Sequence, residues 1–155
     1  MRPSYHLALS AVLGAGVYAA TGEPMAVPVT VAVGTLIDVD HVPDYYWTYV
    51  LRRRPVGIVA LHAWEWMLAW IALDQFLWFP SWLYMAVVFG YGMHLVTDVV
   101  FNKAGAAYYS FIYRAATGFR KGPGFNVDNA MAAMEQRVPY MAFMVRLLRK
   151  DKPNA

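Results

Sequence analysis

The chain has 155 residues, of which 59% are hydrophobic and only 15% are charged, and its net charge is +3 at neutral pH. This composition differs from that of an ordinary soluble domain and favours a single membrane-embedded domain. Because the sequence contains no cysteine, disulfides, thiolate metal sites and cysteine nucleophiles are excluded.

Four apolar runs follow one another along the chain, at about residues 5–20, 25–41, 57–79 and 82–101. A membrane-spanning helix needs ~20 apolar residues, so the first two runs are short and the last two are long enough. Pro24 separates the first two runs and Pro80 the last two. The first run is read as a retained span and not as a signal peptide, because further apolar segments follow it.

The basic residues predict how these runs are oriented. If all four runs cross a membrane, all 13 Lys and Arg residues, Arg52–Arg54 among them, fall on one side. The positive-inside rule then places both termini in the cytoplasm. The sequence therefore predicts an all-α, polytopic bundle of four spans over residues 1–102. We expect it in a bacterial inner or plasma membrane, with a cytoplasmic or interfacial region at residues 103–155.

Ionisable side chains gather at the predicted cytoplasmic ends of the four runs. Each run brings a histidine to this layer, and three of them add carboxylates: His6, Asp38, Asp40, His41, His62, Glu65, His94 and Asp98. Three pairs have helical spacing, namely Asp38 with His41, His62 with Glu65, and His94 with Asp98. Residues at this spacing project from one helix face, as chelating pairs do in helical bundles.

A divalent metal ion is the expected counter-charge for these carboxylates. The runs contain no Lys or Arg with which the carboxylates could pair. Imidazole and carboxylate ligands suit Zn²⁺, or alternatively Mn²⁺ or Fe²⁺, and argue against Cu(I). Taken alone, each histidine could be an interfacial residue and each pair a simple hydrogen bond. Four histidines at one depth favour a metal site.

Several of these residues form motifs that resemble the membrane-bound metal-dependent hydrolase family, which is related by pattern to the zinc-dependent phospholipase C and nuclease group. The similar features are the early His6, the span-ending Asp38-Val39-Asp40-His41, His62, and the H-x-x-x-D motif from His94 to Asp98. The resemblance covers about the first 100 residues. It implies that His94 and Asp98 are central metal ligands, and that Asp98 is able to bridge two ions. The predicted ligand set is His6, Asp38, His41, His62, His94 and Asp98.

Two functions are compatible with this pattern. The first is hydrolysis of a phosphoester, in a phospholipid or a lipid-linked phosphate, at the cytoplasmic leaflet. Glu65 or Asp40, whichever does not bind metal, is then the candidate general base. The alternative is a non-catalytic membrane subunit or scaffold that keeps a structural metal site or a buried His–carboxylate network. It is favoured by one departure: ahead of His62, the first histidine of the family's H-R-G-x-T-H-S motif is missing.

The character of the chain changes after Lys103. Residues from about 128 to 150 have the pattern of an amphipathic helix with a cationic end, in which Pro139 is expected to introduce a kink. Such a helix is suited to lie on the inner leaflet or to dock a partner protein. Membrane lipids are therefore the expected partners, with a protein partner through this helix as a second expectation, and no nucleic acid.

Overall fold

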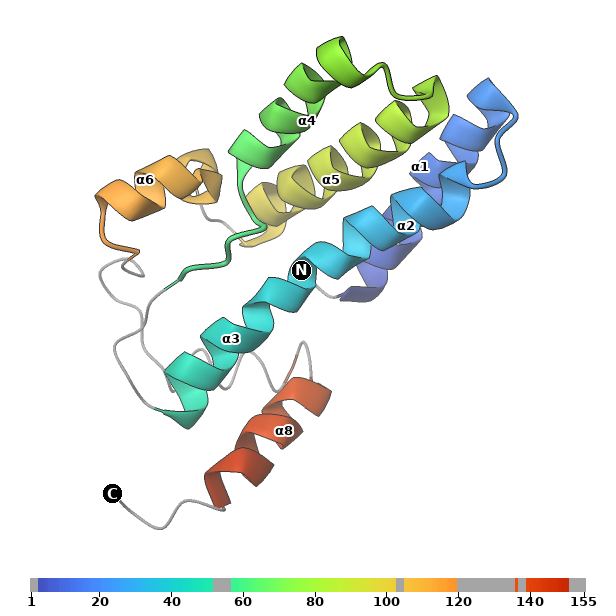
Figure 1. The fold of residues 1–155 in the computed structure, drawn as a ribbon. Helices are drawn as coiled ribbons and strands as arrows, with labels where there is room; N and C mark the ends of the chain where they lie inside the picture. The colour runs from blue at the N-terminus through green and yellow to red at the C-terminus, as the bar shows by residue number, and fades with distance from the viewer. Residues whose placement is uncertain (1–2, 52–56, 103–104, 120–135, 137–138, 151–155) are drawn as a thin grey trace. The chain divides into compact units, whose positions relative to one another are not determined.

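The computed structural model describes residues 3–51, 57–102, 105–119, 136 and 139–150, and every regular element in these ranges is helical. This confirms the predicted all-α class. The chain divides into two compact units, one formed by residues 1–39 and 60–113 and the other by residues 40–59 and 114–155. Figure 1 shows the helices with their labels.

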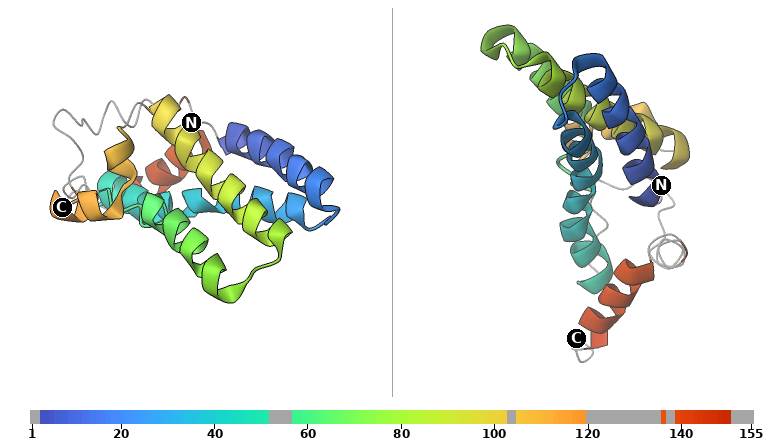
Figure 2. Two further views of the ribbon diagram at one scale, coloured as in Figure 1. Left: turned by 90° about the horizontal axis from the view of Figure 1, so that it is seen from above. Right: turned by 90° about the vertical axis from the view of Figure 1, so that its right-hand side faces the viewer.

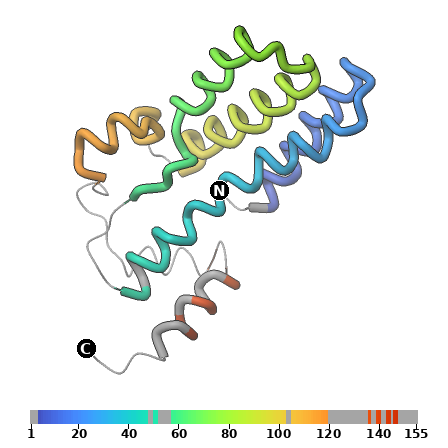
Figure 3. Tube along the Cα trace, viewed as in Figure 1, coloured from blue at the N-terminus to red at the C-terminus, as the bar shows by residue number. Residues whose placement is uncertain are grey.

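The first unit is built on the helices α1 (Pro3–Thr21), α2 (Ala26–Leu36), α4 (Trp64–Leu77) and α5 (Ser81–Asn102). Helices α1, α2 and α5 pack against one another, and α4 runs along α5 (Figures 1 and 2). A 3₁₀ turn, η1 (Ile37–Asp40), continues α2, and a second one, η3 (Ala106–Tyr109), follows α5. The helices lie where the apolar runs predicted them, except that the third begins only at Trp64. The chain enters it through the irregular residues 60–63 (Figure 3).

Glycines allow α1, α2 and α5 to approach one another closely. A Cβ atom added to Gly90 would lie 2.7 Å from the carbonyl oxygen of Thr30, and one added to Gly14 would lie 2.9 Å from the Cα of Val27. A Cβ on Gly34 would lie 3.2 Å from the carbonyl oxygen of Gly90. Small residues at helix crossings let backbones come together in this way, and they are typical of helix pairs in membranes. Any larger residue would push these helices apart.

The interior of the first unit contains polar as well as apolar side chains, and its surface exposes many large apolar ones. The buried polar residues are His6, Ser10, Thr30, His62, His94, Thr97 and Asp98. Large apolar side chains point outward from the same helices; Phe76 of α4 is 78% exposed and Val12 of α1 is 70% exposed. Proteins that fold in water bury such side chains and rarely expose them in number. The exposed apolar surface and the buried polar cluster therefore differ from the usual pattern of a soluble domain.

Two helical stretches are long and apolar enough to cross a membrane, Ala26–Tyr45 and Ser81–Asn102. These two stretches are identified by their length and composition alone. Helix α4 has 14 residues, and at 1.5 Å per residue it is shorter than the ~30 Å of a hydrocarbon core. Helix α1 has 19 residues, but polar and small side chains dilute its apolar content. The arrangement with four spans therefore stays a prediction for α1 and α4.

The second unit contains α3 (His41–Tyr45), a π-helical turn η2 (Tyr46–Val50) and α8 (Pro139–Lys150), which contacts η2; α6 (Phe111–Ala116) contributes its second half. A buried arginine organises the backbone of this unit. The Nη1 of Arg114 donates hydrogen bonds to the carbonyl oxygens of Ile58, at 2.8 Å, and Val59, at 2.9 Å. Asp44, also buried, accepts a hydrogen bond from the Ile58 N–H at 3.2 Å.

Helix α8 covers the second half of the amphipathic segment predicted near the C-terminus. The described part of α8 runs from Pro139 to Lys150. Most of the first half of that segment lies outside the described residues, so the predicted kink at Pro139 stays a prediction. Arg52–Arg54 also lie outside them.

Candidate metal centre

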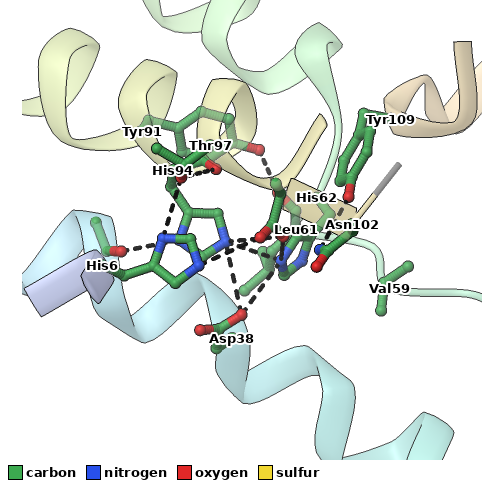
Figure 4. A network of polar contacts seen from close by, with 12 residues as sticks. His6, Asp38, Val59, Leu61, His62, Tyr91, His94, Thr97, Asn102 and Tyr109 are labelled. Carbon is green, nitrogen blue, oxygen red and sulfur yellow. Dashed lines mark hydrogen bonds and ion pairs between the residues drawn. The ribbon is translucent and has the colours of Figure 1, made fainter. Parts of the chain in front are cut away.

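Ionisable side chains from separate segments of the first unit converge on one buried point (Figure 4). These side chains are His6 from α1, Asp38 from η1, His62 from the irregular residues 60–63, and His94 and Asp98 from α5. Within the first unit, the structure thus brings together five residues that were predicted as metal ligands, across up to 92 positions of sequence. Their convergence depends on the close packing of α1, α2 and α5, since each of these helices or its extension carries a ligand.

Four of the donor atoms lie close to one another. The Nε2 of His62 is 3.4 Å from Asp38 Oδ1 and 3.5 Å from Asp98 Oδ2. The Nε2 of His94 is 3.6 Å and 3.7 Å from the same two oxygens. The two Nε2 atoms are 2.9 Å apart. A tetrahedral ion with ligands at ~2.1 Å holds its donor atoms ~3.4 Å apart, so the residues fit a metal such as Zn²⁺.

The tautomer of His94 leaves its inward-facing nitrogen available as a ligand. Its Nδ1 lies 2.8 Å from the carbonyl oxygen of Gly34. Because a carbonyl oxygen only accepts hydrogen bonds, this nitrogen must carry the proton and donate it. The Nε2 of a neutral His94 therefore presents a lone pair to the cluster. A hydrogen bond from the outer ring nitrogen to a backbone carbonyl is the usual support for a metal-binding histidine.

Thr97 orients His6 in a similar way. Its hydroxyl donates to the carbonyl oxygens of Met93 or His94, each 2.9 Å away. Its oxygen can then accept a hydrogen bond from His6 Nδ1 at 3.3 Å. The His6 ring also stacks on that of His94, with centroids 4.1 Å apart. The Nε2 of His6 is thereby directed at the second oxygen of Asp98, Oδ1, at a distance of 3.2 Å.

Asp98 connects the two sides of the cluster. Its Oδ2 faces His62 and His94, and its Oδ1 faces His6. A carboxylate with its two oxygens directed at different sets of imidazoles has the geometry of a bridging ligand. His6, His94 and Asp98 form a group that could hold an ion by themselves. The arrangement is therefore compatible with one ion or with two.

Asp38 is the residue of the cluster that is partly exposed at the surface. The side chain of Asp38 is 29% exposed, whereas those of His62 and Asp98 are 2% and 3% exposed. Three imidazoles and a carboxylate are thus sealed within the helices, and Asp38 forms the edge from which another molecule could approach.

Two further predicted residues lie next to this cluster in sequence. Asp40 is the last residue of η1. His41 is the first residue of α3 and belongs to the second unit, where its ring stacks on that of Tyr45 with centroids 5.6 Å apart. A role for Asp40 as a base and for His41 as a ligand stays a prediction.

Glu65 makes a different set of contacts from those its spacing predicted. His62 precedes the helix and Glu65 lies in the first turn of α4, so the two do not share a helix face. The Oε2 of Glu65 accepts a hydrogen bond from the N–H of Phe111 at 3.0 Å, and Oε1 accepts one from Ile112 at 3.2 Å and another from the Ser110 hydroxyl. These N–H groups begin α6 and have no partner within that helix. Glu65 therefore caps α6 from a distant helix.

Removal of this cap is expected to weaken the first unit. Hydrogen bonds to a charged group contribute ~1.5–3 kcal/mol each at most, and the loss leaves donors unpaired. We expect Glu65→Ala to lower the free energy of unfolding by about 2 kcal/mol, measured by thermal unfolding in detergent. Gln75→Ala, at an exposed position of the same helix, is the matched control and should leave the transition unchanged. An unchanged transition for Glu65→Ala would contradict the capping role.

Thr97 and Gly34 were not among the predicted site residues. Thr97 lies three residues after His94 and Gly34 lies one turn before Asp38, so helical spacing places each of them on a ligand-bearing face. That spacing is the only sequence signal for them. Their hydrogen bonds join residues 91 and 60 positions apart, which sequence periodicity does not reveal.

None of the protein-family models, curated proteins or solved structures with which the chain was compared matches it. The resemblance of its motifs to the membrane-bound metal-dependent hydrolases therefore stays a prediction, and the functional argument rests on the geometry of the cluster.

Proposed function

We propose that this chain is a membrane-embedded, divalent-metal-dependent hydrolase that acts on a phosphoester. The observation that carries the proposal is the convergence of donor atoms from Asp38, His62, His94 and Asp98, with five of their separations between 2.9 Å and 3.7 Å. The two imidazole nitrogens are 2.9 Å apart, which is the distance of a hydrogen bond in the absence of an ion. The two carboxylates beside them supply the negative charge that would favour a cation at this place.

The membrane part of the proposal is supported by the large apolar side chains exposed on the first unit and by the polar side chains buried inside it. Lipid-facing surfaces are apolar, and polar groups within a membrane face the interior and find partners there. The candidate spans Ala26–Tyr45 and Ser81–Asn102 fit this environment. We extend the proposal to the four-span topology with both termini in the cytoplasm, which the distribution of Lys and Arg supports.

Helix α8 is proposed to lie on the inner leaflet. Its exposed apolar residues are Tyr140, Phe143, Met144 and Leu147. They follow the i, i+3, i+4, i+7 spacing of a single helix face. The segment from Pro139 to Lys150 contains basic residues and no acidic one, which suits an anionic lipid surface.

The proposed chemistry is metal-assisted hydrolysis. His62, His94, Asp38 and Asp98 would hold a divalent cation, which would polarise a phosphoryl oxygen and lower the pKa of water toward ~7. Gly34 holds the ring of His94, and Asp98 joins the cluster to His6. The exposed edge at Asp38 is where a lipid phosphate would approach. The oxygens of Glu65 cap α6, so of the two candidate bases Asp40 is the one that stays a prediction.

The metal content and activity of the detergent-solubilised protein test this function. We expect at least one tightly bound divalent ion per chain by elemental mass spectrometry. We also expect hydrolysis in mixed micelles, measured as release of a phosphorylated headgroup from a phospholipid or of phosphate from a lipid-linked phosphate. This activity should be lost on chelation and restored by Zn²⁺ or Mn²⁺. Protein without stoichiometric metal would overturn the proposal.

The second candidate function is a non-catalytic membrane subunit with a structural metal site. The observation that favours it is that four protein donors lie close enough together to bind one ion without any other ligand, as in closed structural zinc sites. Catalytic sites keep a position open. X-ray absorption spectroscopy distinguishes the two: coordination by protein atoms alone, together with bound metal and no hydrolysis of any phosphoester, would favour this candidate.

A further inference from the structure

His62 differs from the other ligands in the backbone that carries it. His6, His94 and Asp98 belong to α1 and α5, and Asp38 belongs to the 3₁₀ turn η1. Residues 60–63 form no helix, and α4 begins only at Trp64. A helix fixes the direction of its side chains through its own hydrogen bonds, whereas an irregular segment needs anchors from elsewhere.

The hydroxyl of Tyr91 anchors the backbone on both sides of His62 (Figure 4). It accepts a hydrogen bond from the N–H of Ala63 at 3.4 Å. It lies 3.0 Å from the carbonyl oxygen of Ala63 and close to that of Leu61, and its single proton can be donated to either one. Tyr91 precedes His94 by three residues in α5, so one rigid helix holds both a ligand and this anchor.

We propose that Tyr91 is a positioning residue that holds His62 in the metal centre through the backbone of Leu61 and Ala63. This inference rests on the metal-binding part of the proposed function, and it is independent of whether the centre hydrolyses a substrate. It assigns to α5 three tasks at successive turns: Tyr91 fixes the His62 segment, and His94 and Asp98 supply donor atoms. The distance of 2.9 Å between the two histidine nitrogens is then set from one helix.

A second contact to the same segment provides a matched comparison. The indole Nε1 of Trp66 donates a hydrogen bond to the carbonyl oxygen of Ala60 at 2.8 Å. This bond lies two residues before His62, whereas the Tyr91 hydroxyl contacts both residues that flank it. Loss of the Trp66 bond removes one anchor of residues 60–63 and leaves the peptide groups on either side of His62 fixed.

The test compares Tyr91→Phe with the wild-type protein, both purified in detergent and loaded with Co²⁺ as a spectroscopic probe. The substitution keeps the ring and removes the hydroxyl. We expect the dissociation constant for Co²⁺ to rise by about tenfold or more, as for other losses of outer supports of metal ligands. We also expect the visible absorption of four-coordinate Co²⁺ to weaken as His62 leaves the ion.

Control variants separate positioning from general stability. Tyr84→Phe removes a phenol hydroxyl two turns earlier in α5, and Trp66→Phe removes the anchor at Ala60. Neither substitution should change the Co²⁺ spectrum. Without metal, these variants and Tyr91→Phe should unfold at similar temperatures. In the His62→Ala background, Tyr91→Phe should weaken Co²⁺ binding no further, because the residue through which it acts is gone.

The outcomes are distinguishable from those for the proposed function. Wild-type Co²⁺ affinity and spectrum in Tyr91→Phe would overturn the positioning role and leave hydrolysis untouched. An equal loss of affinity in the wild-type and His62→Ala backgrounds would also overturn it, since the effect would not run through His62. Metal binding that depends on Tyr91, without hydrolysis, would support the inference and contradict the enzyme. A wild-type protein that binds no Co²⁺ would overturn both.

Discussion

Asp98→Asn is expected to abolish tight binding of a divalent ion. The substitution preserves the size of the side chain and removes a buried negative charge that faces the Nε2 atoms of His6, His62 and His94 within 3.2–3.7 Å. An amide oxygen is a poorer ligand for Zn²⁺ than a carboxylate, and the amide N–H₂ group cannot bind the ion. The loss should exceed the ~10–100-fold effect of removing an outer support, measured by competition with a chelator.

Asp74→Asn is the control for this experiment. Asp74 lies near the end of α4, where its Oδ1 accepts a hydrogen bond from the N–H of Phe79 at 3.2 Å. Asparagine can keep that bond through its own oxygen. Metal affinity should therefore stay at the wild-type value. If Asp98→Asn bound metal as tightly as Asp74→Asn, the cluster would be a hydrogen-bonded network and not a metal centre.

Gly90→Ala is expected to destabilise the first unit and to weaken metal binding together. The added methyl group would lie 2.7 Å from the backbone oxygen of Thr30, and a backbone atom cannot rotate away. Helix α2 must then move from α5, at a cost of about 1–3 kcal/mol. The same movement stretches the hydrogen bond between His94 Nδ1 and Gly34. Thermal unfolding and chelator competition in detergent measure the two effects.

Gly16→Ala is the matched substitution at an open position. A Cβ atom at Gly16 would meet nothing within 4 Å, although the residue also lies inside a helix, α1. Alanine favours helix over glycine by about 1 kcal/mol, so this variant should be as stable as the wild type or more stable. If Gly90→Ala and Gly16→Ala had the same thermal unfolding and the same metal affinity, the contact between α2 and α5 would be looser than the structure indicates.

The sequence predicts a large part of this fold for a physical reason. A helix that lies in one apolar environment along its length consists of a continuous run of apolar residues. The positions of α1, α2 and α5 therefore follow from the apolar runs. The pair His94 and Asp98 could also be predicted, because both lie within one uninterrupted helix whose periodicity fixes their common face.

The interpretation of Glu65 shows where such prediction stops. A spacing of three residues places His62 and Glu65 on one face only if both belong to a helix. The backbone at residues 60–63 is irregular, so this condition is not met. The partners of Glu65 at residues 110–112 lie 45 to 47 positions away and carry no pattern. Tyr91 is similar, since its role depends on backbone groups 28 and 30 positions earlier. Contacts of this kind are fixed by tertiary packing alone.

The charges of the side chains in the cluster also determine which charge a bound metal ion should have. With neutral imidazoles, Asp38 and Asp98 give the pocket two negative charges, and most of that charge is shielded from water. A divalent ion restores electroneutrality, whereas a monovalent or trivalent ion leaves a residual buried charge, which is costly. A second divalent ion would leave two positive charges in excess. A phosphate monoester, as a dianion, would neutralise them on arrival, so occupancy of a second position would be coupled to the presence of the phosphate.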